Sequence, residues 1–171
     1  MQYNYTYTLN FQENSEKKQI EIFACSTNNE KAGQLNGFLR YDEDNRKYYF
    51  ILDNIYITNE HQKNGCGFEM MKLLKNILQD VESKYDIKIW WITGFLGRKG
   101  NTYPDWNSSL PFLEKCSKVL FGNYGFVLYD AAGYNHTNNI SDFITRFISG
   151  HFVIKLDDYC DKQYQFYEIN F

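Results

Sequence analysis

The spacing of hydrophobic residues changes once along this chain, and the change limits what the chain can fold into. From Tyr3 to Phe11, every second residue is a tyrosine, a leucine or a phenylalanine. A repeat of two is typical of a strand with one buried face. Similar patterns predict strands over 19–24, 34–41 and 48–58, separated by polar and turn-forming residues. We therefore expect the chain to begin with four successive antiparallel strands.

From residue 67 onward the hydrophobic residues recur every three or four positions instead. Over 67–85 they are Met70, Met71, Leu73, Leu74, Ile77, Leu78 and Val81. This spacing predicts an amphipathic helix. The next stretch, 87–95, carries apolar residues on both faces at its centre, which is typical of a strand buried on both sides.

The remaining elements are shorter. Residues 97–109 combine Gly, Arg, Lys, Asn, Pro and Asp, which predicts a loop. A short helix is expected over 110–120, with Ser109 as its cap and Pro111 in its first turn. Beyond it we expect strands over 126–129 and 151–156, a helical segment over 140–148 and an edge strand over 164–171.

Length, composition and charge exclude several classes of protein. A chain of 171 residues, 43% of them hydrophobic, predicts one folded domain and not a disordered chain. Its apolar runs fall short of the about 20 residues that cross a bilayer, and we find no secretory signal. The widely spaced cysteines favour free thiols in a reducing cytoplasm; they are Cys25, Cys66, Cys116 and Cys160. A net charge of −3 offers no general attraction to nucleic acid or to an anionic membrane.

The segment with the clearest chemistry joins the strand over 48–58 to the helix over 67–85. A glycine-containing loop, Gln62–Gly67, lies at this junction. The first N–H groups of a helix and the positive end of its dipole form an anion site that suits a pyrophosphate, to which Lys63 can add charge. The alternative is that Gly65 and Gly67 only form a tight turn. The P-loop pattern and the dinucleotide fingerprint are both absent.

The same junction resembles motif A of the GNAT superfamily of N-acetyltransferases. That motif runs hydrophobic-x-hydrophobic-x-Pro-x-x-Arg/Gln-x-x-Gly-x-Gly/Ala, and residues 55–67 match it except that Asn59 replaces the proline. Residues 113–126, ending in Asn-Tyr-Gly-Phe, are similar to motif B. The resemblance covers about 36–128 and fades before it, where the family usually has one or two helices. It implies a single α+β domain over 1–171: a mixed, mostly antiparallel central sheet with a V-shaped opening and helices on both faces.

The resemblance also implies a reaction, in which a primary amine attacks acetyl-coenzyme A directly in a ternary complex. The backbone of Ile55 and Ile57 would pair with the pantetheine arm. The pyrophosphate would lie against the backbone of the loop residues, which are Gln62, Lys63, Asn64, Gly65, Cys66 and Gly67. Asp53 is the candidate base for the amine proton; the alternative is an exposed strand carboxylate or a turn cap.

Other expected site residues follow less directly. The usual acid of the family, a tyrosine, corresponds to Phe121, which leaves Tyr124 as candidate acid or as a core aromatic. Asn107 is the nearest match to a family asparagine that contacts coenzyme A. Because aromatic rings and a carboxylate suit a cationic amine, we expect three residues to shape the acceptor pocket; these are Tyr103, Asp105 and Trp106.

Alternative functions stay open at this point. A catalytically weak coenzyme A-binding module, or a toxin-like one that acts through a partner, would fit the phenylalanine at position 121. An RNA-binding module would fit the aromatic strands 55–59 and 123–129, although their separation and the acidic charge disfavour it. We expect a small-molecule or peptide amine as acceptor and no nucleic acid or membrane partner. We also expect no metal, because the three histidines lack ligand spacing. Many family members form dimers, and 164–171 is the edge through which we expect a homodimer to pair.

Overall fold

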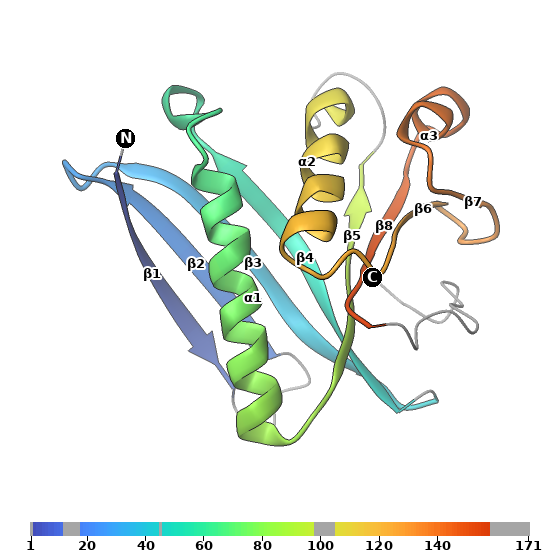
Figure 1. Cartoon of the computed structure of the whole chain (residues 1–171), viewed down its shortest axis with the longest axis horizontal. Helices are drawn as coiled ribbons and strands as arrows, with labels where there is room; N and C mark the ends of the chain where they lie inside the picture. The colour runs from blue at the N-terminus through green and yellow to red at the C-terminus, as the bar shows by residue number, and fades with distance from the viewer. Residues whose placement is uncertain (1, 12–17, 45, 98–104, 158–171) are drawn as a thin grey trace. The chain divides into compact units, whose positions relative to one another are not determined.

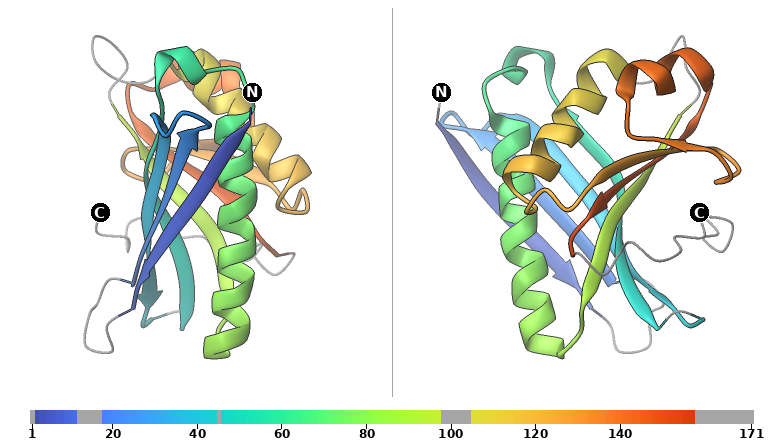
Figure 2. Two further views of the ribbon diagram at one scale, coloured as in Figure 1. Left: turned by 90° about the vertical axis from the view of Figure 1, so that its left-hand side faces the viewer. Right: turned by 45° about the vertical axis from the view of Figure 1, so that its right-hand side comes forward.

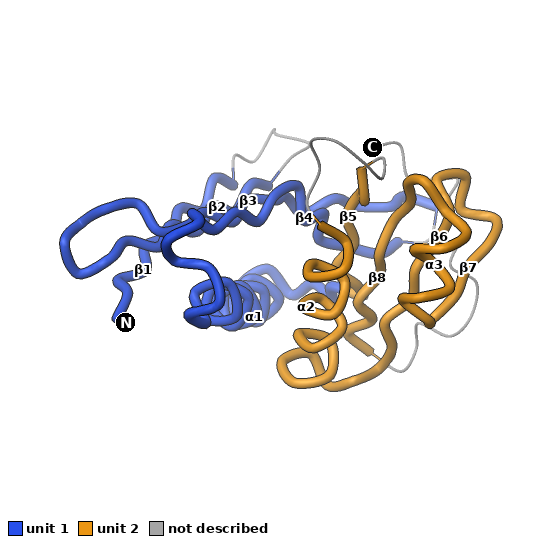
Figure 3. Tube along the Cα trace, turned by 90° about the horizontal axis from the view of Figure 1, so that it is seen from above, with its two compact units in different colours: residues 1–89 blue, residues 90–171 orange. Residues whose placement is uncertain are grey.

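The chain is described by a computed structural model that covers residues 2–11, 18–44, 46–97 and 105–157. It divides into two compact units, Met1–Ile89 and Trp90–Phe171 (Figure 3). Each unit is described here by itself, and a single domain over 1–171 stays a prediction. Two of the expected features, the edge strand over 164–171 and Cys160, lie outside the described residues.

Unit 1 opens with the four expected strands, paired antiparallel in chain order (Figure 1). They are β1 (Tyr3–Asn10), β2 (Lys18–Ser26), β3 (Lys31–Asp42) and β4 (Lys47–Ile57). A short 3-10 turn, η1 (Asn59–His61), and the helix α1 (Cys66–Tyr85) complete the unit. The predicted four-stranded meander is therefore confirmed, and with it the absence of helices from residues 2–11 and 18–35.

The core of unit 1 lies between α1 and one face of this sheet (Figure 2). Gly33 of β3 and Met70 of α1 mark the contact, since a Cβ on Gly33 would lie 3.2 Å from the Met70 Cε. Fully buried side chains from the strands and the helix fill the space, among them Ile20, Ile22, Leu35, Phe50, Met70, Met71 and Leu74. Among the described residues of unit 1, no helix covers the other face of the sheet.

A β-bulge interrupts the pairing of β3 with β4. Gly37 lies opposite Leu52 and Asn36 opposite Asn54, so that Asp53 is an extra residue on β4. The bulge shifts the alternation by one position, and Asp53 and Asn54 are consequently both exposed. The sequence carries no clear sign of this shift, because buried residues occupy every position from Tyr49 to Leu52 before it.

Unit 2 contains four strands that pair antiparallel in the order β5-β8-β6-β7. Its helices contact each other, α2 also contacts β8, and α3 also contacts β7. The elements are β5 (Ile89–Leu96), α2 (Trp106–Val119), β6 (Phe126–Asp130), β7 (His136–Thr137), α3 (Ile140–Arg146) and β8 (Gly150–Lys155). The two-residue strand β7 was not expected, because a pairing this short leaves no periodic pattern.

The start of α2 differs from the prediction. The helix begins at Trp106 and its cap is Asp105, whose carboxylate accepts a hydrogen bond from the Asn107 N–H. The prediction of a cap at Ser109 was wrong, since that residue lies inside the helix with its buried Oγ unpaired among the described residues. Pro111 consequently lies beyond the first turn, and the loop expected over 97–109 ends before Trp106.

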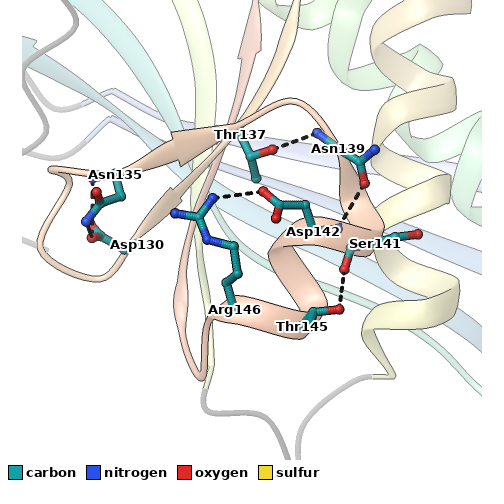
Figure 4. A network of polar contacts seen from close by, with 8 residues as sticks. All are labelled: Asp130, Asn135, Thr137, Asn139, Ser141, Asp142, Thr145 and Arg146. Carbon is teal, nitrogen blue, oxygen red and sulfur yellow. Dashed lines mark hydrogen bonds and ion pairs between the residues drawn. The ribbon is translucent and has the colours of Figure 1, made fainter.

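Side-chain hydrogen bonds close the start of α3 (Figure 4). The Asn139 Oδ1 accepts the Asp142 N–H at 2.9 Å, and the Thr137 Oγ1 accepts the Asn139 N–H at 3.1 Å. Arg146 pairs with Asp142 across one turn of the helix at 3.0 Å. Among the described residues, no helix is both long and apolar enough to cross a membrane.

Candidate functional site

The last residues of β4 present their backbone groups to the edge of the strand that β3 does not occupy. Ile57 pairs with Gly33 and Ile55 with Leu35, and the Thr58 N–H donates to the Ala32 carbonyl at 2.9 Å. Hydrogen-bonded and non-hydrogen-bonded pairs alternate along an antiparallel ladder. Because Thr58 and Ala32 are a hydrogen-bonded pair, the pairs formed by Ile57 and by Ile55 are not. The N–H and C=O groups of Ile55 and Ile57 therefore point away from β3. This is the direction needed to pair with an extended ligand.

The loop after β4 is exposed and its backbone is unusual. Lys63 and Gly65 both adopt left-handed conformations, with φ of 63° and 81°. The side chain of Gln62 holds the start of the loop, because its Nε2 donates to the Ile57 carbonyl at 3.3 Å and to the Asn59 Oδ1 at 3.1 Å. The residues Gln62, Lys63, Asn64 and Gly65 are all exposed.

Helix α1 begins at this loop without a side-chain cap. Its cap residue is Gly65, whose carbonyl accepts the Glu69 N–H at 3.0 Å. Helix geometry leaves the N–H groups of Cys66 and Gly67 without an acceptor one turn back. A Cβ at Gly65 would meet nothing within 4 Å, so the backbone there is open to a ligand. The loop thus fits an anionic group such as a pyrophosphate, with the dipole of a 20-residue helix behind it.

Cys66 contributes its backbone to this loop, while its side chain points into the protein. The residue is only 1% exposed, and its thiol lies close enough to the hydroxyl of Tyr5 on β1 to interact with it. Burial raises the pKa of the Cys66 thiol, and the hydrogen bond to Tyr5 offsets only part of that rise. Burial likewise raises the pKa of Tyr5, with the neighbouring Cys66 adding to the rise. The Cys66 side chain is therefore a neutral thiol at the N-terminus of the helix.

His61, the last residue of η1, is also attached to β1. Its Nδ1 lies 3.3 Å from the Oη of Tyr3, and the two rings meet edge to face with centroids 5.5 Å apart. Neither Tyr3 nor Tyr5 was among the residues predicted for the site. The available signal was the alternation of β1, which puts both tyrosines on one face of the strand.

Asp53 is exposed at the bulge of β4, and its Oδ2 accepts a hydrogen bond from the Asn36 Nδ2 at 3.3 Å. It belongs to the same unit as Ile55, Ile57 and the loop Gln62–Gly67, only two residues before Ile55 on the same strand. An exposed carboxylate that keeps contact with water is able to accept a proton. Its role as a base stays a prediction, as does the alternative of a plain surface carboxylate.

Of the residues expected to bind the acceptor and the cofactor, those at 105–107 have structural roles in unit 2. Trp106 is the first residue of α2, only 5% exposed, with its ring 5.2 Å from that of Phe143 on α3. Both the N–H and the side-chain Nδ2 of Asn107 donate to the Asp105 Oδ1, at 3.0 and 3.1 Å. The expectation that Trp106 lies in a loop was wrong. Tyr103 lies outside the described residues.

Tyr124 lies in a tight turn between α2 and β6. It is 43% exposed, so the alternative of a buried core aromatic was wrong. Its ring covers Gly122, where a Cβ would lie 3.1 Å from the Tyr124 Cδ2. Phe121, at the position of the family's tyrosine, is 7% exposed. The candidate acid thus keeps an accessible hydroxyl, while the residue before the turn is part of the core.

Comparison with known proteins gave similar structures but no similar sequences. No protein-family model matches the chain, and no curated protein does. Naa20 from Chaetomium thermophilum, solved with a bisubstrate analogue, has a TM-score of 0.48 and 14% identity over 85% of this chain and 70% of its own. Nourseothricin acetyltransferase has a TM-score of 0.47 and 16% identity over 81% of this chain and 66% of its own. A spermidine N-acetyltransferase SpeG chimera from Vibrio cholerae and hSSAT has a TM-score of 0.45 and 12% identity, over 88% of this chain and 73% of its own.

The order of elements agrees with the family resemblance in the sequence. The strand β4 leads through the glycine loop into α1, and β5, α2 and β6 follow, with the Gly-Phe pair at the start of β6. The pairs of strands described within each unit are antiparallel. Strands take the place of the family's first helices. The described residues thus form an α+β fold whose order of elements is the one that the GNAT resemblance implies.

Proposed function

We propose that this chain is an N-acetyltransferase that moves an acetyl group from acetyl-coenzyme A to a primary amine. One observation carries the proposal: residues 55–67 join a strand end, an exposed loop and an uncapped helix start in one continuous stretch of backbone. The strand end points its N–H and C=O groups away from β3, the loop is exposed, and α1 begins without a side-chain cap. A ligand that is amide-containing at one end and pyrophosphate-containing at the other suits this backbone.

The backbone roles follow from these directions. The N–H and C=O groups of Ile55 and Ile57 bind the amides of the pantetheine arm as a neighbouring strand would. The N–H groups of the loop from Gln62 to Gly67 bind the pyrophosphate, and Lys63 adds a positive charge. Bound acetyl-coenzyme A supplies the thioester carbonyl that the amine attacks, so the protein's main contribution is to position the two reactants.

Two side chains are proposed to move protons. Asp53 removes a proton from the acceptor ammonium, directly or through one water, and the Asn36 amide orients its carboxylate. Tyr124 protonates the leaving thiolate through its exposed hydroxyl. Because the Asn107 amide donates one N–H to Asp105, its oxygen and its second N–H are the groups left for a contact with coenzyme A. The acceptor is a small molecule or a peptide with a primary amine.

A weak coenzyme A-binding module is the second candidate, and the buried Phe121 in place of the family's tyrosine favours it. Both candidates predict that acetyl-coenzyme A raises the melting temperature while ATP does not. A ligand at 100 times its Kd adds about 2.7 kcal/mol to stability, which for this size is a rise of several degrees. No shift at millimolar acetyl-coenzyme A would contradict both.

Turnover separates the two candidates. Release of free coenzyme A is measured with a panel of amines, and any amine that gives turnover identifies an enzyme. Asp53→Asn should then lower kcat about 100-fold or more, the usual contribution of a general base, with the Kd of acetyl-coenzyme A unchanged. Asp44→Asn, an exposed carboxylate on the same hairpin, is the matched control. Equal kcat values for the two variants would remove Asp53 from the mechanism.

A further inference from the structure

The strand β1 places two tyrosine hydroxyls at the two ends of the glycine loop. The Tyr3 Oη lies 3.3 Å from the Nδ1 of His61, and the Tyr5 hydroxyl lies close enough to the thiol of Cys66 to affect its pKa. His61 is the last residue of η1 and Cys66 is the first of α1. The exposed segment Gln62–Gly65 between them is thus tied to β1 at both ends.

The partners of the two tyrosines are fixed points. His61 is 8% exposed and Cys66 is 1% exposed. Tyr3 and Tyr5 are held in turn by the antiparallel pairing of β1 with β2, opposite Ser26 and Ala24. A strand in a ladder is stiffer than a loop, so the loop takes its position from β1 through these two contacts.

We infer that Tyr3 and Tyr5 are positioning residues for the cofactor loop, an inference that rests on the proposed function. They hold the loop with Lys63 and Gly65 left-handed, so that its N–H groups already face the pyrophosphate before it binds. A loop ordered in advance loses less conformational entropy on binding, which increases affinity. In this role the tyrosines act on the ligand through His61 and Cys66.

The test compares Tyr3→Phe/Tyr5→Phe with wild type and with Tyr7→Phe. Tyr7 lies on the same face of β1, is 50% exposed and makes no side-chain hydrogen bond to the described residues, so its change controls for loss of a hydroxyl on this strand. Each protein is measured for coenzyme A affinity by calorimetry, for KM and kcat, and for amide hydrogen exchange of residues 62–67 without ligand. Single variants Tyr3→Phe and Tyr5→Phe cover the case in which the double variant fails to fold.

We expect coenzyme A to bind the double variant about fivefold to tenfold more weakly, the effect of about one net hydrogen bond. KM for acetyl-coenzyme A should rise with kcat unchanged, exchange at 62–67 should become faster, and Tyr7→Phe should resemble wild type. Unchanged affinity and exchange in the double variant would overturn the inference, as would an equal loss in Tyr7→Phe. If wild type binds no coenzyme A, the proposed function fails, and exchange alone then decides whether β1 holds the loop.

Discussion

The two longest of the helices that the structure describes begin in opposite ways. The 20-residue α1 begins after a glycine, with no side-chain cap and an exposed loop in front of it. The 14-residue α2 begins after Asp105, which accepts the Asn107 N–H, while the Ser108 hydroxyl donates to the Asp105 carbonyl at 3.0 Å. A first N–H group of α2 has an acceptor in the protein's own side chains. The first N–H groups of α1 have no such side-chain acceptor, which leaves them available to a ligand.

The short helix α3 follows α2 in this respect, because Asn139 caps it with a side-chain oxygen (Figure 4). Relative to such a side-chain cap, the glycine at the start of α1 costs the helix about a few tenths of a kcal/mol. The comparison teaches that an uncapped start is informative when the other α-helices that the structure describes are capped. The comparison can be tested by substitution, because a side-chain acceptor can be added at the start of α1 and removed from the start of α2.

The largest effect on stability is expected at the start of α2, from a change at Trp106. Trp106→Ala should lower the free energy of unfolding by about 3–5 kcal/mol, because it removes a large buried ring packed against Phe143. Urea denaturation measures this loss, and Trp106→Phe should lose less. If Trp106 instead forms the acceptor pocket, as its sequence context suggested, Trp106→Phe will raise the acceptor KM with stability little changed.

At the start of α1, an added negative charge should weaken the binding of coenzyme A. Gly65→Asp places a carboxylate where we propose that the pyrophosphate binds, and coenzyme A affinity should fall about 100-fold, or about 2.7 kcal/mol. Gly65→Asn is the matched control, since asparagine tolerates the left-handed conformation and carries no charge. Calorimetry on both variants separates backbone strain from repulsion. Equal affinities for the two variants would contradict an anion site at this loop.

Removing the cap of α2 should have a smaller effect, confined to stability. Asp105→Ala takes away the acceptor of the Asn107 N–H and should cost about 1 kcal/mol, a fall in Tm of about 2–4 °C for a chain of this size. Coenzyme A affinity, measured alongside, should not change. A loss of affinity without a loss of stability would instead make Asp105 a binding residue.

The smallest effect is expected on stability at low pH, through the carboxyl group of Asp130. Burial acts to raise the pKa of Asp130, but hydrogen bonds from Asn135, Tyr134 and Gly133 lower it overall from its ordinary value of 3.8. A carboxyl with a lowered pKa in the folded state adds stability above the ordinary value and loses it as the pH falls further. Wild type should therefore lose stability below about pH 4 more steeply than Asp130→Asn. Parallel unfolding curves across pH 3 to 6 would contradict this.

The sequence predicted the parts of the fold that are periodic. The alternation from Tyr3 and the helical spacing from residue 67 gave the strands and α1 with small errors at their ends. The start of α2 was missed because Asp105 follows a proline in a stretch assigned to a loop, whereas Ser109 directly precedes an apolar run. The helical spacing of Trp106, Leu110 and Leu113 was the signal that could have placed the start correctly. Sequence order could not show that Tyr3 and Tyr5 reach His61 and Cys66, because those contacts span about 60 positions and depend on how β1 packs.

The candidate site divides in the same way. The loop from Gln62 to Gly67 was predictable, because glycines at a strand-to-helix junction have a local physical meaning. The acceptor residues were not predictable, since a tryptophan beside an aspartate is equally consistent with a pocket and with a capped, packed helix end. At Trp106 and Asp105 the packing and capping roles are the ones that the structure shows.

The bulge at Asp53 also affects how β4 tolerates insertion and deletion. Asp53 is the residue of β4 that has no pairing partner on β3. In a chain that lacks it, Leu52 would be followed directly by Asn54, and β3 and β4 would pair in a regular ladder. Every apolar side chain of the strand would keep its side of the sheet. A deletion elsewhere in the strand would turn one half of it inside out. Position 53 is therefore a place where evolution can add or remove a residue, and with it a carboxylate, without changing the core.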